Sequence, residues 1–175
     1  MKRILIAVLL LSITALSACA NDTQPATVGT LTENDLIFVI DGTEFPLDSD
    51  VAPLLIAFGE DYTLTTAPSC LYDGEDKVFD YPFSSIYTYP IDGKDLIDEI
   101  FIFDGEYQTN KNIKIGSTLD EVKAQYGTNG YLVDSSYFYV LSGDVEDLES
   151  PKLFFDLLDD KVIGISYYAA SNITE

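Results

Sequence analysis

Two short amphipathic segments of similar pattern occur along the chain, DSDVAPLLIAFG ending at Gly59 and GSTLDEVKAQYG ending at Gly127. With the two glycines aligned, apolar residues recur at i, i+3 and i+7 in both, which is the spacing of one helical face. Thr118 and Glu121 have the spacing of a capping box, and Asp50 has the position of an N-cap in the first segment. Glycine suits the left-handed position that ends a helix. The pattern therefore predicts one short helix in each segment.

Aromatic and β-branched runs follow both segments. After the first come KVFDYPF, SSIYTYP and LIDEIFIFD, and after the second come SSYFYVLS, PKLFFDLL and KVIGISYYA. Such runs, bounded by turn residues, are typical of antiparallel strands, and FVIDGTEF has the Asp-Gly pair of a hairpin. We therefore predict an α+β fold of two tandem repeats, each with one helix and a three-stranded antiparallel sheet, at residues 35–105 and 106–172. Coincidence between short amphipathic segments is the alternative.

The first 18 residues have the pattern of a secretory signal, with basic MKR, the apolar run ILIAVLLLSITAL and the small residues LSA. Together with the next residue, Cys19, they resemble the lipobox of bacterial lipoproteins, which implies that Cys19 carries diacylglycerol. Two acyl chains hold a protein firmly to a membrane. We expect an extracytoplasmic protein anchored to the cell membrane through Cys19, with residues 19–34 as a lipidated flexible tether. An ordinary signal peptide that ends near a cysteine is the alternative.

Charge and composition narrow the possible chemistry. Without Lys2 and Arg3, the mature chain has seven lysines against 30 acidic residues, a net charge of −23. Such a charge repels nucleic acid and anionic lipid headgroups. The chain has no histidine, which excludes Ser-His-Asp triads, Cys-His nucleophiles and zinc sites that contain histidine.

Cys70, in APSCLY, is expected to be a small buried hydrophobe, with a reactive thiol as the alternative.

Tyrosine is frequent, at 12 residues, and its distribution suggests a binding surface. A sheet covered by helices on one side leaves its other face open. Exposed tyrosines suit recognition because each has a large flat ring and a polar tip. We predict a protein-binding surface formed by Tyr87, Tyr89, Tyr137, Tyr139 and Tyr168. For each of them, packing in the core is the alternative.

Acidic residues cluster in DGEDKVFD, DGKDLIDE and LLDDK, but none of these runs has the spacing of an EF-hand loop. We therefore expect solvated turns and no metal or other cofactor. Paired acids could also catalyse glycoside hydrolysis, although the chain has no tryptophan on which a sugar could stack. A non-catalytic binding module is the favoured interpretation. A small carboxylate-dependent hydrolase acting on envelope sugar or peptide is the alternative.

The segment IKIGSTLDEVKAQYG, followed by a strand pair and VIGISYY, resembles the Gly-Ser/Thr-x-x-x-Glu-Val-x-x-x-x-Gly pattern of a known superfamily. This superfamily includes the outer-membrane assembly lipoproteins (SmpA/OmlA) and the β-lactamase-inhibitor proteins. The pair of segments with APSC between them also looks like uncharacterised lipoproteins of Firmicutes. The resemblance implies helices on one face of an antiparallel sheet and a non-catalytic binding or envelope-assembly role. The first segment has Pro53-Leu54 in place of Glu-Val, so no particular partner is implied.

Overall fold

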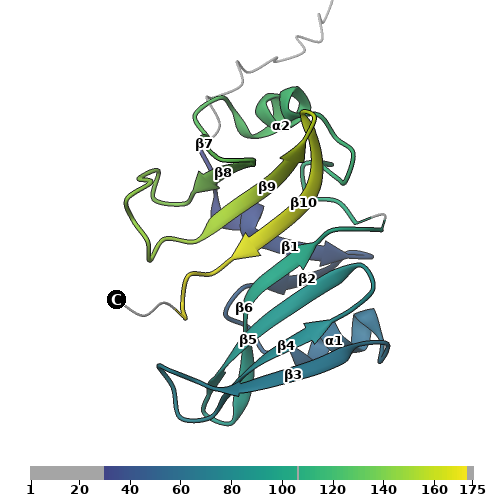
Figure 1. Ribbon diagram of the computed structural model, residues 1–175, viewed down its shortest axis with the longest axis vertical. Helices are drawn as coiled ribbons and strands as arrows, with labels where there is room; N and C mark the ends of the chain where they lie inside the picture. The colour runs from purple at the N-terminus through teal and green to yellow at the C-terminus, as the bar shows by residue number, and fades with distance from the viewer. Residues whose placement is uncertain (1–29, 106, 173–175) are drawn as a thin grey trace, which may run out of the picture.

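The computed structural model describes residues 30–105 and 107–172 of the chain (Figure 1). The predicted signal segment and Cys19 lie outside the described residues, so lipid attachment stays a prediction. The described part begins at Thr30, within the range predicted as a tether, and the side chain of Leu31 is already buried in the core. In this part of the chain, no helix has the length and apolar character needed to span a membrane.

The described chain is mostly β-structure. Its elements are η1 (Glu33–Leu36), β1 (Ile37–Ile40), β2 (Thr43–Pro46), α1 (Ala52–Phe58), β3 (Thr63–Pro68), β4 (Glu75–Asp80), β5 (Ser84–Ile91), β6 (Lys94–Ile102), α2 (Leu119–Tyr126), β7 (Tyr131–Val133), β8 (Ser136–Val140), β9 (Lys152–Leu158) and β10 (Lys161–Tyr168). Strands β3 to β10 form one eight-stranded sheet in the order β3-β4-β5-β6-β10-β9-β8-β7, and all its pairs are antiparallel. Strands β1 and β2 form a separate hairpin.

The predicted α+β fold of two tandem helix-plus-three-stranded repeats is wrong. Strand β6 pairs with β10, with Ile102 opposite Ile165 and Glu99 opposite Tyr168. These ladder hydrogen bonds join the strands that follow both helices into one continuous sheet. Each helix is also followed by four strands rather than three, because β3 and β7 were not predicted. All six residues of β3 are exposed, so its sequence TLTTAP lacks the apolar alternation that identifies a half-buried strand.

The two helices end in the same way. Both glycines have positive φ, 88° at Gly59 and 90° at Gly127, a backbone conformation that glycine adopts without a Cβ penalty. A later tyrosine donates a hydrogen bond to each glycine carbonyl: Tyr81, just after β4, at 2.9 Å, and Tyr139 of β8 at 2.6 Å. The predicted capping box of α2 is confirmed, because the backbone N–H of Glu121 donates to the Thr118 hydroxyl at 3.2 Å.

Tight turns connect the antiparallel strands where acidic residues and glycine adopt positive φ. Asp41 and Gly42 have φ of 49° and 79° between β1 and β2, and Asp159 and Asp160 have φ of 51° and 59° between β9 and β10. Two successive residues with positive φ are the requirement of a type I′ hairpin turn, for which Asp-Gly is a preferred pair. The hairpin predicted at FVIDGTEF and the tight connection at LLDDK are therefore both confirmed.

One face of the sheet is covered and the other is open. Both helices and the β1–β2 hairpin lie behind the sheet as it faces the viewer in Figure 1. Leu54 of α1, Val122 of α2 and Phe38 of β1 are buried against the covered face. The ring of Phe38 lies 5.6 Å from that of Tyr167 in β10, centroid to centroid. A single apolar core thus underlies the middle of the sheet, and burial of such side chains is the main stabilising contribution.

Candidate binding groove on the open sheet face

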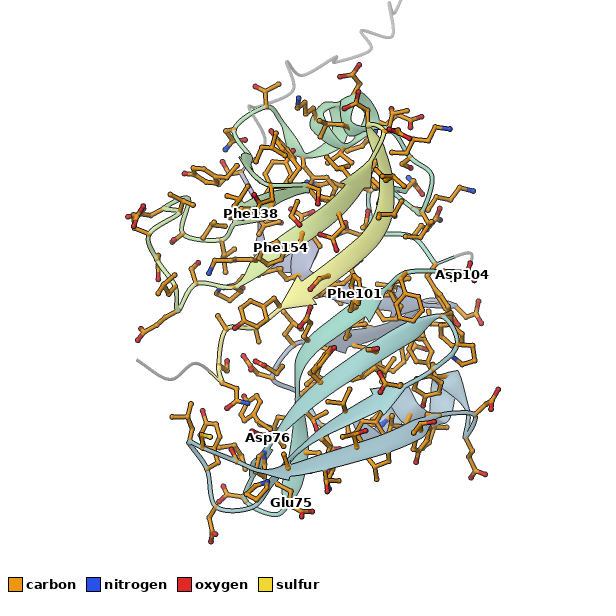
Figure 2. All side chains as sticks on the ribbon, in the orientation of Figure 1. Glu75, Asp76, Phe101, Asp104, Phe138 and Phe154 are labelled. Atoms are coloured by element: carbon orange, nitrogen blue, oxygen red, sulfur yellow. The ribbon has the colours of Figure 1, made fainter. Side chains whose placement is uncertain are left out.

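An aromatic row crosses the open face of the sheet. Its members share one line of cross-strand neighbours: Phe101 of β6 is opposite Ser166 of β10, Ser166 is opposite Phe154 of β9, and Phe154 is opposite Phe138 of β8. Residues directly opposite one another on antiparallel strands share a face. Figure 2 shows the labelled Phe101, Phe154 and Phe138 following one another across the front of the sheet. We call these three phenylalanines the aromatic row.

A groove of about 540 Å³ lies over this part of the sheet. The open-face groove, as we call it, is lined by Tyr87, Glu99, Phe101, Phe154, Asp156, Ser166 and Tyr168. These residues come from β5, β6, β10 and β9, so the groove spans the central pairing of β6 with β10. Its aromatic rings are half-buried or exposed rather than buried, and Tyr87 is 38% exposed. The groove therefore presents apolar surface to solvent at the centre of the sheet.

Gly164 makes room for the floor of the groove. A Cβ atom at this position would lie 2.7 Å from Cε2 of Phe101 and 3.0 Å from Oδ2 of Asp156. Both side chains therefore reach over β10 at the glycine. The pairing of β10 with β9 also shifts register between Val162 and Gly164, and such a bulge redirects the side chains beside it. A glycine within a strand commonly marks this kind of close approach.

Two carboxylates converge on the groove from different strands. Glu99 accepts a hydrogen bond from the Ser166 hydroxyl, and Asp156 accepts one from the Ser136 hydroxyl. Glu99 thus reaches β10 at Ser166, and Asp156 reaches it at Gly164, two residues away. At a rise of about 3.3 Å per residue, these two points on β10 are about 7 Å apart. Sequence reasoning did not pair these acids, because only the register of three strands brings them together.

Burial raises the pKa of Glu99, and the negative charge of Asp156 raises it further, while the hydrogen bond from Ser166 lowers it. The same surroundings raise the pKa of Tyr87 through burial first and through the charge of Glu99 second. An ionised carboxylate is therefore less favourable at Glu99 than in water. A positive charge in the groove would favour the ionised form of Glu99 and so lower its pKa.

Only two of the five predicted tyrosines lie in the open-face groove, Tyr87 and Tyr168. Tyr137 and Tyr139 are buried in the core on the covered side, at 4% and 2% exposure. Tyr89 is also buried, and its hydroxyl donates to Oδ1 of Asp48 at 2.7 Å. The five tyrosines therefore do not form one surface, and core packing, the alternative left open for each, applies to three of them.

The residues that sequence reasoning missed are the phenylalanines of the aromatic row and the two carboxylates. In SYFYV of β8 the side chains alternate between faces. Tyr137 and Tyr139 belong to the core, whereas Phe138, opposite Phe154, lies on the open side and is covered to 7% exposure by its neighbours there. The polar residues Glu99, Asp156 and Ser166 within otherwise apolar strands were the available signal, because a polar residue in such a strand indicates its solvent face.

Cys70 is exposed, so the prediction that it is a small buried hydrophobe is wrong. It follows the end of β3 in the turn that leads to β4, where no core lies beside it. Across residues 30–105 and 107–172, no group of three histidine, cysteine or acidic side chains is arranged to hold a metal ion.

No protein-family model and no curated protein matches the chain. Among solved structures, it is similar to the crystal structure of the uncharacterized protein yfeY from Escherichia coli, with a TM-score of 0.42 and 14% sequence identity. The match covers 81% of this chain and 97% of that one. A similarity of this size supports no argument about function, which therefore rests on the geometry of the groove.

Proposed function

We propose that this chain is a lipid-anchored, extracytoplasmic binding or envelope-assembly module that recognises a protein partner, without catalysis, through the open-face groove and the aromatic row. The carrying observation is the position of the aromatic residues. Phe101, Phe154 and Tyr168 come from three neighbouring strands and line one groove, on the sheet face opposite the helices. Large aromatic rings held by a rigid sheet bind with little loss of side-chain entropy, which is the property of interface anchors.

The proposed location rests on the N-terminal sequence. A signal-like segment followed by Cys19 supports lipid attachment, and the net charge of −23 for the mature chain supports a fold held away from anionic headgroups. A protein tethered in this way meets its partner beside the membrane. Strands β3 and β7 form the two edges of the sheet, whereas the aromatic residues proposed to bind the partner lie on its broad face.

Co-purification tests the proposed function with matched variants. The full chain would be isolated from its native envelope with Phe154→Ala in the groove, or with Ile56→Ala as control. Ile56 is 83% exposed and belongs to α1 on the opposite side of the molecule. We expect a defined protein to accompany the wild type and the control and to be depleted with Phe154→Ala. Equal recovery with all three proteins would refute the proposal.

A second candidate is a carboxylate-dependent hydrolase that acts on envelope sugar or peptide. One observation favours it: Glu99 and Asp156 converge on the groove, and the pKa of Glu99 is raised by burial and by Asp156. A raised pKa is a property of a general acid, and glycoside hydrolysis uses two carboxyl groups that act on one bond. Release of reducing ends or free amines from purified envelope polymer, lost in Glu99→Gln, would favour this candidate over a binding module.

A further inference from the structure

The open-face groove has two acidic side chains, Glu99 and Asp156, and the described residues provide no counter-ion for them. Among the described residues, no ion pair includes Glu99 or Asp156. Their hydrogen-bond donors are the neutral hydroxyls of Ser166 and Ser136. The carboxylates are therefore held in place without being neutralised.

The lysine of β9, Lys152, does not neutralise the groove carboxylates, because its ammonium group binds the loop between β8 and β9. Lys152 donates its ammonium protons to the backbone carbonyls of Asp147, Leu148 and Ser150, at 3.0, 3.0 and 2.7 Å. Its side chain is buried, and this burial lowers its pKa. Lys152 thus closes the loop between β8 and β9 and leaves the groove acidic.

Aromatic rings surround these two carboxylates. Tyr87, Phe101, Phe154 and Tyr168 line the same groove as Glu99 and Asp156. The face of an aromatic ring attracts a cation through its quadrupole, and the attraction increases when the cation loses water. A long aliphatic stem can lie along the rings while its charged end reaches the carboxylates.

We propose that the open-face groove takes a lysine or arginine side chain, presented by a basic segment of the protein partner. This inference rests on the proposed function and specifies the chemistry of the partner. Charge complementarity supports this occupant over an acidic or neutral one, because the mature chain has a net charge of −23. Such a charge steers a basic partner toward the protein and raises its rate of association.

Binding of a defined probe tests the inference. The mature chain, kept in detergent micelles, would be titrated calorimetrically with the acetylated pentapeptide Gly-Lys-Gly-Lys-Gly amide. Its neutral counterpart has norleucine in place of both lysines. We expect the lysine peptide to bind, the norleucine peptide to bind at least about tenfold more weakly, and the affinity to fall as salt rises from about 50 mM to about 500 mM.

Two double variants with the same net charge separate the groove from the general charge of the protein. In Glu99→Gln/Asp156→Asn both groove carboxylates are removed. In Glu60→Gln/Glu75→Gln two exposed carboxylates outside the groove are removed, and Figure 2 shows Glu75 near the far end of the sheet from Phe154. We expect the first variant to lose about tenfold in affinity for the lysine peptide and the second less than about twofold.

The outcomes distinguish this inference from the proposed function. Equal loss in both double variants, or equal binding of the norleucine peptide, would overturn the basic-side-chain inference. Binding of an N-acetylglucosamine oligomer in place of the lysine peptide would overturn it as well, and would favour the hydrolase. If Phe154→Ala depletes the co-purified protein while Glu99→Gln/Asp156→Asn retains it, the binding function stands and the inference fails. If both variants retain it, both proposals fail.

Discussion

Substitution of Gly164 by alanine tests the geometry of the groove floor. The added Cβ would lie 2.7 Å from Cε2 of Phe101, whereas ordinary contacts begin at 3.4 Å. The ring must therefore move by about 0.7 Å or more, because repulsion rises steeply inside the contact distance. Overpacking of this kind costs about 1–3 kcal/mol. The loss of glycine flexibility in the unfolded chain offsets about 0.5–1 kcal/mol of this cost.

The expected net effect is a destabilisation of about 1 kcal/mol. Urea denaturation of the mature chain would measure it, and a change of about 1 kcal/mol corresponds to a shift in Tm of about 2–4 °C for a protein of this size. The Phe101→Ala background supplies the control, because removing the ring removes the main clash. In that background, Gly164→Ala is expected to be neutral or stabilising.

The double-mutant comparison determines whether the ring causes the effect. A coupling free energy of about 1 kcal/mol or more between positions 101 and 164 is expected for side chains in direct contact. If Gly164→Ala stabilises the wild-type chain, or changes its stability equally in both backgrounds, Phe101 does not lie over the glycine.

Three further predictions concern the ion pair of Lys111 with Asp35, the protonation of Asp98 and the proposed lipid anchor at Cys19. Lys111→Met should destabilise the fold by about 3 kcal/mol in urea denaturation. The substitution removes the counter-ion of Asp35, whose carboxylate is 2% exposed and 3.0 Å from the Lys111 ammonium, and leaves only its hydrogen bonds from Thr32. A loss no larger than that of Lys94→Met, which breaks an exposed pair, would contradict this. Burial raises the pKa of Asp98 to about 6, so its contribution to stability is present below about pH 4 and is lost as pH rises through about 6. Asp98→Asn should therefore flatten the fall in Tm between these pH values, and an unchanged slope would refute the assignment. Cys19→Ala should release the protein from the membrane pellet, and unchanged pelleting would exclude a lipid anchor.

Local features were predictable from the sequence because they depend on neighbouring residues. The helix stops at Gly59 and Gly127 follow from glycine at the end of an apolar face, and the capping box at Thr118 follows from a spacing of three residues. The turn at Asp41 and Gly42 likewise follows from the conformations these two residues prefer. Each of these features is a contact within a few residues of sequence.

The joining of the strands into one sheet was not predictable in this way. The contact of Ser166 with Glu99 spans 67 residues of sequence, and no periodicity within β6 or β10 specifies which strand will pair with which. The same limit applies to the binding surface. A shift of one residue exchanges the two faces of a strand, and this determines that Phe138 rather than Tyr137 or Tyr139 lies on the open side. Register comes from packing of the whole sheet, so the groove is visible only in the folded chain.

Site-specific photocrosslinking in the native envelope tests the central claim most directly. A photoreactive phenylalanine analogue would replace Tyr168 in the groove or Ile56 on α1, which lie on opposite faces of the sheet. We expect one defined crosslinked protein from position 168, little or none from position 56, and loss of that product when Phe154→Ala is added. Equal crosslinking from both positions, or a product that persists in the Phe154→Ala background, would contradict recognition through the open-face groove.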